Sequence, residues 1–285
     1  MNRALIALLF STVLYGLLGI YSRFIGIDFG IFFQSWTRNF IITLLIVPFF
    51  LFNFWKQIRR KDAQWFVLRS LGDLVTMVSI FVVFNKIAIG TSYFLFYAGS
   101  TVGGYLIGHY FFKEKITKQK LTSLIIGIFG LVLIYSLSLQ KDKLFFYLLA
   151  NLAGLSSAVW NIFSKKVSKD YSVAQIVFID SFMTGLLGLA LSILFHEKFI
   201  PFMLNSQWIA NILFAVNSLV TSFLVVYGFR YVEANYGSLI LLLEVIFGIF
   251  FAFIFFKEIP SLYALIGGSL ILTAVIIPKL KWPTS

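Results

Sequence analysis

The sequence has no cysteine, and only two histidines and five prolines, among its 285 residues. The lack of cysteine excludes disulfide frameworks, thiolate zinc sites and cysteine nucleophiles. With His109 and His196 as the whole supply of imidazole, a histidine metal centre is not expected. The phosphate-binding pattern G-x-x-x-x-G-K-[ST] is also absent, which argues against an ATP-driven pump. We therefore expect no metal and no other cofactor.

Charged residues are also scarce. They make up 12% of the chain, whereas 60% of the residues are hydrophobic and the mean hydropathy is +0.95. Soluble domains are about a quarter charged, and the cores of a chain of this length cannot hide such an apolar excess. The solvent must therefore be lipid. In a membrane protein basic residues most often mark the cytoplasmic loops, so the net charge of +12 does not lead us to expect a nucleic-acid partner.

Long apolar runs predict the membrane spans, because a bilayer core needs about 20 apolar residues per helix. Ten such runs occur, at residues 3–22, 31–54, 63–85, 90–112, 118–138, 144–164, 172–195, 206–229, 234–256 and 261–279. The first run is too long for the apolar part of a signal peptide and no small-residue cleavage pattern follows it, so we expect it to be retained. The sequence thus predicts an all-α integral membrane protein with ten transmembrane helices.

The distribution of basic residues predicts the orientation. An even number of spans places both termini on one side of the membrane. Fifteen lysines and arginines fall on that side and six on the opposite side, while Arg38 and Arg69 lie within spans. Because cytoplasmic loops carry the basic excess, we expect both termini in the cytoplasm and the chain in the plasma or inner membrane of the cell.

An internal repeat divides the chain into two halves. Phe111-Phe112-Lys113-Glu114 recurs 144 residues later as Phe255-Phe256-Lys257-Glu258. Weaker matches have nearly the same offset: Lys86 with Arg230, Leu74-Val75-Thr76 with Leu219-Val220-Thr221, and Ser22-Arg23 with Ser164-Lys165. Because five spans is an odd number, the second half would cross the membrane upside down relative to the first. We therefore predict a 5+5 inverted-topology repeat of residues 1–140 and 141–285, an architecture typical of transporters.

Glutamates end the fourth and the ninth predicted spans, at Glu114 and Glu258. The ninth span also carries Glu244 after the run 237–243, and the glycine pair Gly267-Gly268 follows in the tenth. Together with the 5+5 arrangement, these features resemble the drug/metabolite transporter superfamily, specifically its EamA-type transporters, over the whole chain.

The resemblance implies a function and a local bend. Such proteins move small organic metabolites, often outward, without ATP hydrolysis, and their fifth and tenth spans pack peripherally or in a homodimer contact. Members commonly carry a proline after the mid-helix glutamate, with a counterpart in the fourth span. This chain has Val245 and the stretch 100–104 at those places, where paired glycines could provide a softer bend.

Four ionisable residues lie well inside the predicted spans: Arg38, Asp73, Asp180 and Glu244. Each would cost about 2.5–3.5 kcal/mol at a lipid-facing helix centre, so we expect all four to face inward. At about 1.5 Å of rise per residue, all four fall in one layer near the membrane midplane. Arg69 lies only about six residues from the cytoplasmic end of its span, from where its side chain could reach the interface, so we leave it outside the site.

Two interpretations of these charges are open. They can form structural ion pairs that lock neighbouring helices without contacting a substrate. Alternatively, Glu244, Asp73 or Asp180 binds a cationic group or a coupling proton, while Arg38 neutralises the resting site or holds a carboxylate. Arg38 and Asp180 occupy repeat-equivalent positions with opposite charge.

Uncharged side chains on the inward faces complete the candidate site. The predicted substrate-binding residues are Gln34, Arg38, Asp73, Tyr97, Thr101, Trp160, Asn161, Asp180, Asn217 and Glu244. Small and polar residues at helical spacing mark the faces that carry the uncharged members. The alternative is that these faces are packing seams, in which polar side chains hydrogen-bond between helices. We interpret Glu114 and Glu258 as structural residues that cap or salt-bridge the turn into the next helix.

The sequence favours a secondary-active or facilitative carrier of small organic metabolites such as amino acids or amines, exporting them by alternating access around a midplane cavity. Proton coupling and a homodimer are open. The alternatives are a membrane-embedded enzyme acting on lipid-linked substrates and a non-transporting scaffold. Such an enzyme usually places its carboxylates near the headgroups, whereas these lie at the midplane between short loops. A scaffold has little reason to bury charge on four helices. We therefore expect no enzymatic activity.

Overall fold

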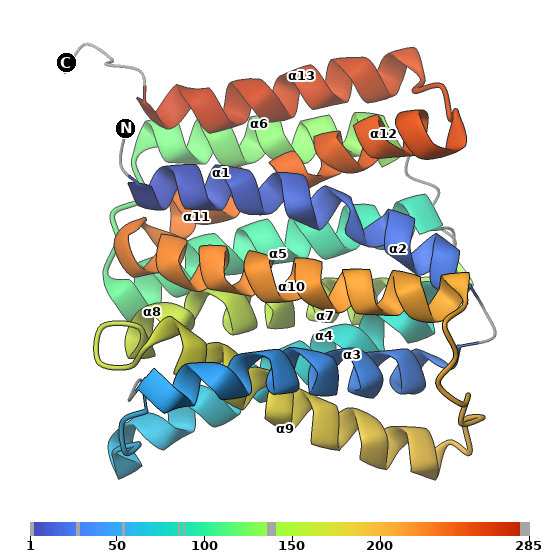
Figure 1. Ribbon diagram of the computed structural model, residues 1–285. Helices are drawn as coiled ribbons and strands as arrows, with labels where there is room; N and C mark the ends of the chain where they lie inside the picture. The colour runs from blue at the N-terminus through green and yellow to red at the C-terminus, as the bar shows by residue number, and fades with distance from the viewer. Residues whose placement is uncertain are drawn as a thin grey trace. The chain divides into compact units, whose positions relative to one another are not determined.

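Every regular element in the described part of the chain is a helix (Figure 1). The computed structural model describes residues 3–26, 29–52, 55–84, 86–87, 89–135 and 141–279. No strand occurs within these ranges. The predicted all-α class is therefore confirmed.

Each of the ten predicted spans coincides with one helix or with two consecutive helices. The single helices are α4 (Arg60–Phe84), α5 (Ile89–Phe112), α6 (Lys118–Tyr135), α9 (Val173–Leu194) and α10 (Ser206–Tyr231). The pairs are α1 (Arg3–Gly16) with α2 (Leu18–Ile25), α3 (Ile31–Ile46) with η1 (Val47–Phe52), α7 (Leu144–Ile162) with α8 (Ser164–Val167), α11 (Ala234–Leu241) with α12 (Leu243–Phe256), and α13 (Leu262–Ile276) with η3 (Ile277–Lys279). A short turn, η2 (Lys141–Lys143), precedes α7. The ends of the predicted ranges 31–54, 63–85 and 118–138 lie outside the described residues.

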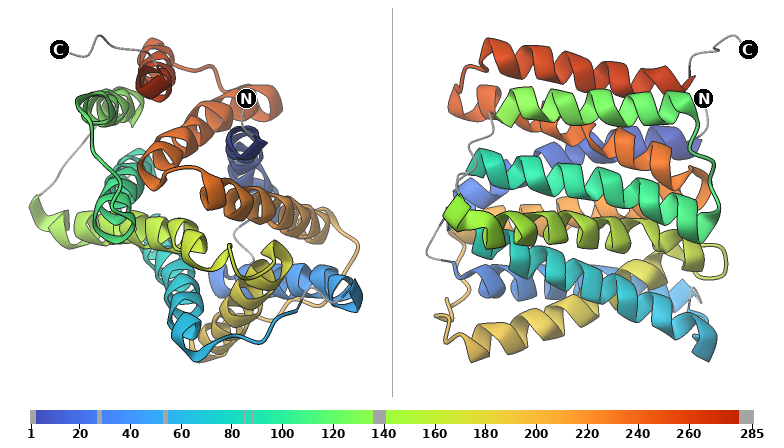
Figure 2. Two further views of the ribbon diagram at one scale, coloured as in Figure 1. Left: turned by 90° about the vertical axis from the view of Figure 1, so that its left-hand side faces the viewer. Right: turned by 180° about the vertical axis from the view of Figure 1, so that it is seen from behind.

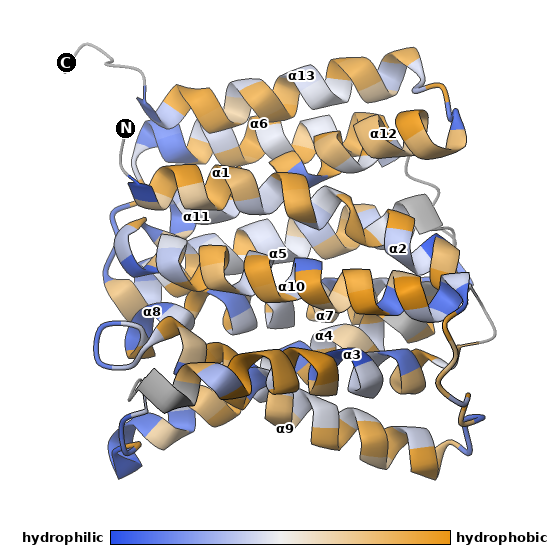
Figure 3. Ribbon diagram, in the orientation of Figure 1, coloured by the Kyte–Doolittle hydropathy of each residue, from blue (hydrophilic) through white to orange (hydrophobic). Residues whose placement is uncertain are grey.

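Eight helical segments of the described residues are long and apolar enough to cross a membrane. They are Arg3–Ile25, Ile31–Phe49, Lys118–Tyr135, Lys141–Val167, Val173–Leu194, Ser206–Tyr231, Ala234–Phe256 and Leu262–Lys279. Large apolar side chains are exposed on them, among them Leu44 and Leu194 at 69% and 66%. Figure 3 shows hydrophilic residues mainly at helix ends and turns. Such helices need lipid around them, so the chain is a multi-pass membrane protein. Because α4 and α5 are not among the eight, ten spans stay a prediction.

Helix contacts group the chain into two compact units. Unit 1 consists of Met1–Leu74 and Trp160–Tyr231, and unit 2 of Val75–Val159 and Val232–Ser285. Two of the three boundaries fall inside helices, one in α4 and one in α7, and the third lies between α10 and α11. Each unit contains helices from both predicted halves. The division into 1–140 and 141–285 describes a repeat rather than a packing unit, and it stays a prediction.

Within each unit a few helix pairs make most of the packing. In unit 1, α10 packs against α1, α2 and α3, and α3 packs against α9. In unit 2, α6 packs against α13 and α5 against α11. Figure 2 shows α6 and α13 side by side in both views. These pairs bring together segments that are far apart in the sequence.

Three helices are interrupted within a predicted span. α1 passes into α2 at Leu17, α7 into α8 at Phe163, and α11 into α12 at Leu242. Backbone bonds between residues three apart replace the α-helical pattern there, as from Leu17 N to Leu14 O (3.1 Å). The ninth predicted span is thus interrupted without the family's proline. In contrast, α5 runs unbroken through the glycine pair at 103–104.

Side chains satisfy backbone carbonyls beside two of these interruptions. Asn217 Nδ2 donates to Leu14 O over 2.9 Å beside the α1–α2 interruption. Ser164 Oγ donates to Asn161 O over 2.6 Å beside the α7–α8 interruption. An unsatisfied backbone group in hydrocarbon would cost several kcal/mol, because no water is there to bond it. The interruptions are therefore stabilised by polar side chains and not by proline.

Three helices end on the same pattern, a residue in the left-handed region followed by a glutamate. Lys113, His196 and Lys257 have φ of 57°, 53° and 58°. The glutamates that follow are Glu114, Glu197 and Glu258. Their backbone N–H groups bond back into the helix, at 2.9, 2.9 and 3.4 Å, as in a Schellman-type helix end.

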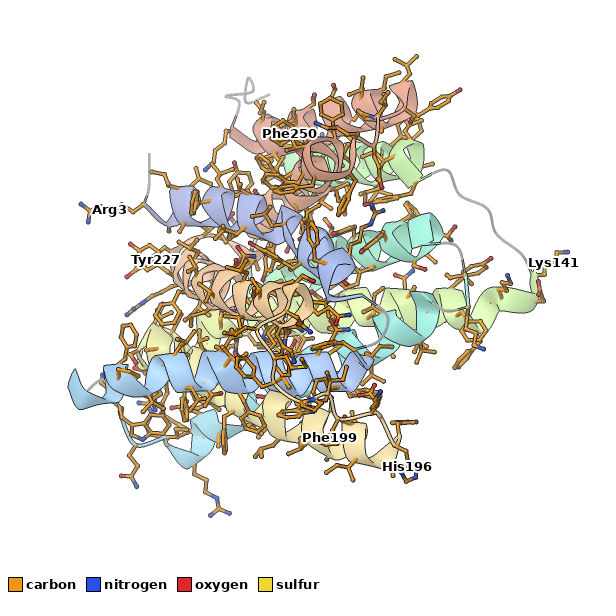
Figure 4. All side chains as sticks on the ribbon, turned by 45° about the vertical axis from the view of Figure 1, so that its right-hand side comes forward. Arg3, Lys141, His196, Phe199, Tyr227 and Phe250 are labelled. Carbon is orange, nitrogen blue, oxygen red and sulfur yellow. The ribbon has the colours of Figure 1, made fainter. Side chains whose placement is uncertain are left out.

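Two of these glutamates cap the N-terminus of another helix. Glu114 accepts hydrogen bonds from the backbone of the first two residues of α11, at 2.8 and 3.1 Å. Glu197, in the turn marked by His196 and Phe199 in Figure 4, accepts from Phe32 N (3.0 Å) and Phe33 N (2.6 Å) in α3. A carboxylate at a helix N-terminus accepts hydrogen bonds from the free backbone N–H groups and is attracted by the positive end of the helix dipole. The predicted capping role of Glu114 is confirmed. The prediction that it caps the next helix along the chain is wrong, because it caps α11.

A hydrogen-bonded cluster fixes the turn before α4 to the start of α9 in unit 1. Asp62 Oδ2 accepts from Arg59 Nε (2.6 Å) and from the Tyr171 hydroxyl (2.8 Å). Arg59 also pairs with Asp170. Burial of Asp62 opposes its ionisation, but the hydrogen bonds from Arg59 and Tyr171 outweigh burial and hold the pKa of Asp62 below its ordinary value.

We expect Asp62 to contribute to acid sensitivity. Because its folded-state pKa is lowered, the ionised carboxylate stabilises the fold above the unfolded pKa of about 4, and this contribution is lost as the pH falls through the lower folded-state value. Asp62→Asn should lower the midpoint of thermal unfolding in detergent by about 2 °C at pH 6 and by much less at pH 3. Asp142→Asn, at an exposed position, is the control. Equal shifts at both pH values would contradict this role.

Candidate functional site

Unit 1 contains a buried ion pair between two of its helices. The Arg69 guanidinium of α4 pairs with the Asp180 carboxylate of α9, and the two side chains are 2% and 8% exposed. A second nitrogen of Arg69 donates to Trp160 O, just before the α7–α8 interruption. Arg69 therefore neutralises a buried acid and satisfies a backbone carbonyl at once.

The prediction that Arg69 reaches the membrane interface is wrong, because Asp180 lies within its reach inside the protein. Depth along the helices could have indicated this pairing. Arg69 and Asp180 lie about six and eight residues from the predicted cytoplasmic ends of their spans, a difference of about 3 Å. For Arg38 and Asp180 the difference is about 6 Å. The ion pair forms between the charges of matched depth.

Arg38 and Asp73 complete the unit 1 cluster, which we define as Arg38, Arg69, Asp73 and Asp180. The Arg38 guanidinium on α3 lies 4.1 Å from the ring centroid of Phe214, in a cation–π contact. Asp73, one turn after Arg69 on α4, accepts a hydrogen bond of 2.8 Å from the Thr184 hydroxyl. Arg38 and Asp73 interact electrostatically, but no ion pair to Arg38 occurs among the described residues.

Two of the uncharged residues predicted in unit 1, Asn161 and Asn217, bond to a neighbouring helix. Asn161 Oδ1 accepts a long hydrogen bond of 3.4 Å from the Tyr15 hydroxyl. Gln34 is buried one turn before Arg38. The amide nitrogen of Asn217 bonds to the α1–α2 interruption, so packing alone accounts for this residue.

The unit 2 cluster consists of Glu244, Tyr93, Tyr97 and Tyr135. The Tyr97 hydroxyl on α5 donates to Glu244 Oε1 over 3.0 Å, two residues beyond the α11–α12 interruption. The rings of the three tyrosines stack with centroids between 5.9 and 6.5 Å apart. Thr101 Oγ1 donates back to Tyr97 O over 2.8 Å, so this predicted residue bonds to its own helix.

Sequence reasoning missed Tyr93, Tyr135 and Thr184. Tyr93 lies one turn before Tyr97 on α5, so helical spacing could have found it. Tyr135 and Thr184 lie on other helices and no sequence signal marks them. Across the described residues, no group of three histidine, aspartate or glutamate side chains could hold a metal ion.

We expect Arg69 to stabilise the protein more than Arg38 does. Arg69→Met leaves the buried Asp180 without its cation and should lower the free energy of unfolding by about 3–5 kcal/mol. Combining it with Asp180→Leu removes both charges and should recover most of the loss. Arg38→Met breaks no ion pair and is the matched control. Denaturant unfolding in mixed micelles measures all three, and equal losses in the single and double variants would contradict this role.

Comparisons with known proteins agree with the resemblance seen in the sequence. Residues 144–278 match the EamA-like transporter family. An uncharacterized transporter of Archaeoglobus fulgidus is 26% identical over 273 residues, which are 95% of this chain and 94% of that protein. The uncharacterized transporter YoaV of Bacillus subtilis is 26% identical over 178 residues, 58% of each protein.

A likeness of fold extends over the whole chain. A protein of known crystal structure, 14% identical, matches with a TM-score of 0.85 over 98% of this chain and 99% of its own. At this identity the match concerns the fold alone. The family match confirms the resemblance to EamA-type transporters over residues 144–278, and the chain is a multi-pass membrane protein.

Proposed function

We propose that this protein is a secondary-active or facilitative carrier that exports small organic metabolites, such as amino acids or amines, by alternating access. The family match and the transporter relatives support the general class. The observation that carries the proposal is that intramembrane charge coincides with interrupted helices. Arg69 bonds beside the α7–α8 interruption, and Glu244 lies two residues beyond the α11–α12 interruption. Interrupted spans combined with intramembrane charge are typical of transporter substrate and ion sites.

Contacts between equivalent positions support an inverted repeat. The interruptions at Leu17 and Phe163 are 146 residues apart. Tyr15 and Asn161, two residues before each interruption, hydrogen-bond to each other across the same offset of 146. In unit 2, Tyr97 and Glu244 do so across 147. Residues beside a two-fold axis contact their own equivalents. These offsets agree with the 144 of the Phe-Phe-Lys-Glu repeat and favour repeats of 1–140 and 141–285.

The polar clusters weigh against the two alternatives. A lipid-modifying enzyme needs its acids near the headgroups, whereas Asp73 and Asp180 lie two or more turns inside α4 and α9. Glu244 lies ten residues from the start of the apolar segment Ala234–Phe256. A scaffold gains nothing from a cation within a predicted span such as Arg38, which locks no helices through an ion pair with the described residues. Proton coupling is part of the same proposal. So is a homodimer contact through α6 and α13, which rests on the resemblance to the family.

We further propose that α4 and α5 also cross the membrane, which gives ten spans with both termini in the cytoplasm and the chain in the cell membrane. The two helices have 25 and 24 residues, about 36 Å at 1.5 Å per residue, and a hydrocarbon core is about 30 Å thick. The excess of basic residues on the side of the termini supports the orientation.

The lack of cysteine makes this topology testable with single cysteines. Lys56, Lys86 and Lys115 lie before α4, between α4 and α5, and after α5. A membrane-impermeant maleimide added to intact cells should label Lys86→Cys, but neither Lys56→Cys nor Lys115→Cys. Lysed cells, in which all three should react, are the control. Labelling of all three or of none in intact cells would show that α4 and α5 do not both span.

Counterflow in proteoliposomes tests carrier activity. Vesicles loaded with unlabelled amino acids or amines should transiently accumulate at least one labelled counterpart, while protein-free vesicles should not. Arg38→Ala should slow this uptake by about tenfold, because a lost charge-assisted contact is worth about 1.5–3 kcal/mol.

Two controls sharpen the assay. Leu44→Ala, on the outward face of the same helix α3, should leave uptake within about twofold of the native rate. Equal rates with and without a pH gradient would exclude proton coupling. Absence of counterflow for the whole library, with folded protein in the vesicles, would contradict the carrier proposal.

A further inference from the structure

The two clusters differ in their charge balance. The unit 1 cluster has two acids, Asp73 and Asp180, and two bases, Arg38 and Arg69. The unit 2 cluster has one acid and no base. Glu244 has a neutral phenol, Tyr97, as its hydrogen-bond partner, and no lysine or arginine in the described part of the chain forms an ion pair with it. Within the described residues of unit 2, no ion-pair partner therefore balances Glu244.

The described basic residues next to the helices of the unit 2 cluster lie at helix ends, far from the cluster along each helix. On its own helix, Lys257 is thirteen residues away, which corresponds to about 20 Å. On α6, Lys120 and Tyr135 are fifteen residues apart, about 22 Å. On α5, Tyr97 is sixteen residues from Lys113, about 24 Å. An ionised carboxylate in such surroundings is stable only opposite a cation, and without one the carboxyl takes up a proton. A cationic ligand can provide that charge.

The surroundings of Glu244 suit an organic cation better than a bare metal ion. Three stacked tyrosine rings lie beside it, and the negative face of an aromatic ring attracts ammonium groups by cation–π interaction. A fourth ring, Phe96, meets Tyr97 edge to face with centroids 5.2 Å apart. Hard metal ions need several oxygen ligands, whereas here a single carboxylate is joined by rings and a phenol.

We propose that the unit 2 cluster binds the ammonium group of a small organic cation. Glu244 pairs with the positive nitrogen, which replaces the Tyr97 hydroxyl as its partner, and the rings of Tyr93, Tyr97 and Tyr135 hold the carbon atoms around that nitrogen. The cluster discriminates against anions, because Glu244 repels them and no base offsets the repulsion. As a statement about cargo this inference rests on the proposed carrier function, but binding itself does not require transport.

Binding to the purified full-length protein in detergent tests the proposal. Isothermal titration calorimetry measures the binding of three ammonium ions, ethylammonium, phenethylammonium and tetraethylammonium. Their uncharged counterparts, in the same order, are ethanol, 2-phenylethanol and tetraethylmethane. At least one ammonium ion should bind about tenfold or more tightly than its counterpart, the worth of one charge-assisted contact. The acid phenylacetate should bind no better than 2-phenylethanol.

Variants assign the preference to the cluster. Glu244→Gln keeps the side-chain shape and should abolish the preference for the ammonium ion without changing the binding of its counterpart. Tyr135→Leu should weaken ammonium binding about fivefold, whereas Tyr135→Phe, which retains the ring, should change it less than about twofold. Glu258→Gln makes the same substitution at the exposed end of the same span and is the matched control.

Two results would overturn the proposal: no preference for any ammonium ion over its counterpart, or a preference that survives in folded Glu244→Gln. Counterflow by the native protein separates these from failure of the carrier proposal. Counterflow without an ammonium preference overturns the site and leaves the carrier. An ammonium preference without any counterflow supports the site and overturns the carrier.

Discussion

The absence of water from the hydrocarbon core is the constraint on which this structure depends. Polar groups there need partners inside the protein, since an unsatisfied one costs several kcal/mol. Arg69 meets this requirement for a carboxylate and a backbone carbonyl together. Asn217 meets it for a carbonyl at the α1–α2 interruption, and Thr184 for Asp73. Few polar side chains thus hold both the charges and the irregular backbone in place.

This double use couples charge to helix geometry within unit 1. The Arg69 side chain of α4 bonds to α9 through Asp180 and to α7 at its interruption. If α7 moves along α4, either the bond from Arg69 to Trp160 O breaks or the Arg69 side chain follows α7. In the second case Asp180 on α9 must move with Arg69, or their ion pair breaks. Interfaces of this kind have discrete arrangements rather than a continuous range, which is what a carrier with two access states requires.

The positions of the helices could be predicted from the sequence, but the interruptions could not. Apolar run length is a local property, and it placed a helix in each predicted range. The interruption at Leu17 is bonded by Asn217, 203 residues from Leu14, and no proline marks it. The cost of burying charge correctly identified Asp180 as a residue that faces the protein interior. Its partner Arg69 was assigned to the membrane interface because its distance from the end of its span was considered alone and was not compared with the depth of Asp180.

The two interpretations that the sequence leaves open fit different groups. Arg69 and Asp180 have the geometry of a structural lock, since each is buried and neutralises the other. Arg38 and Glu244 do not fit that interpretation: Arg38 contacts a ring and Glu244 a phenol, and neither forms an ion pair with the described residues. A charge kept in the membrane without a direct ion pair is costly, and binding a charged ligand offsets that cost. The unpaired charges, and not the paired ones, are therefore the better candidates for contact with cargo.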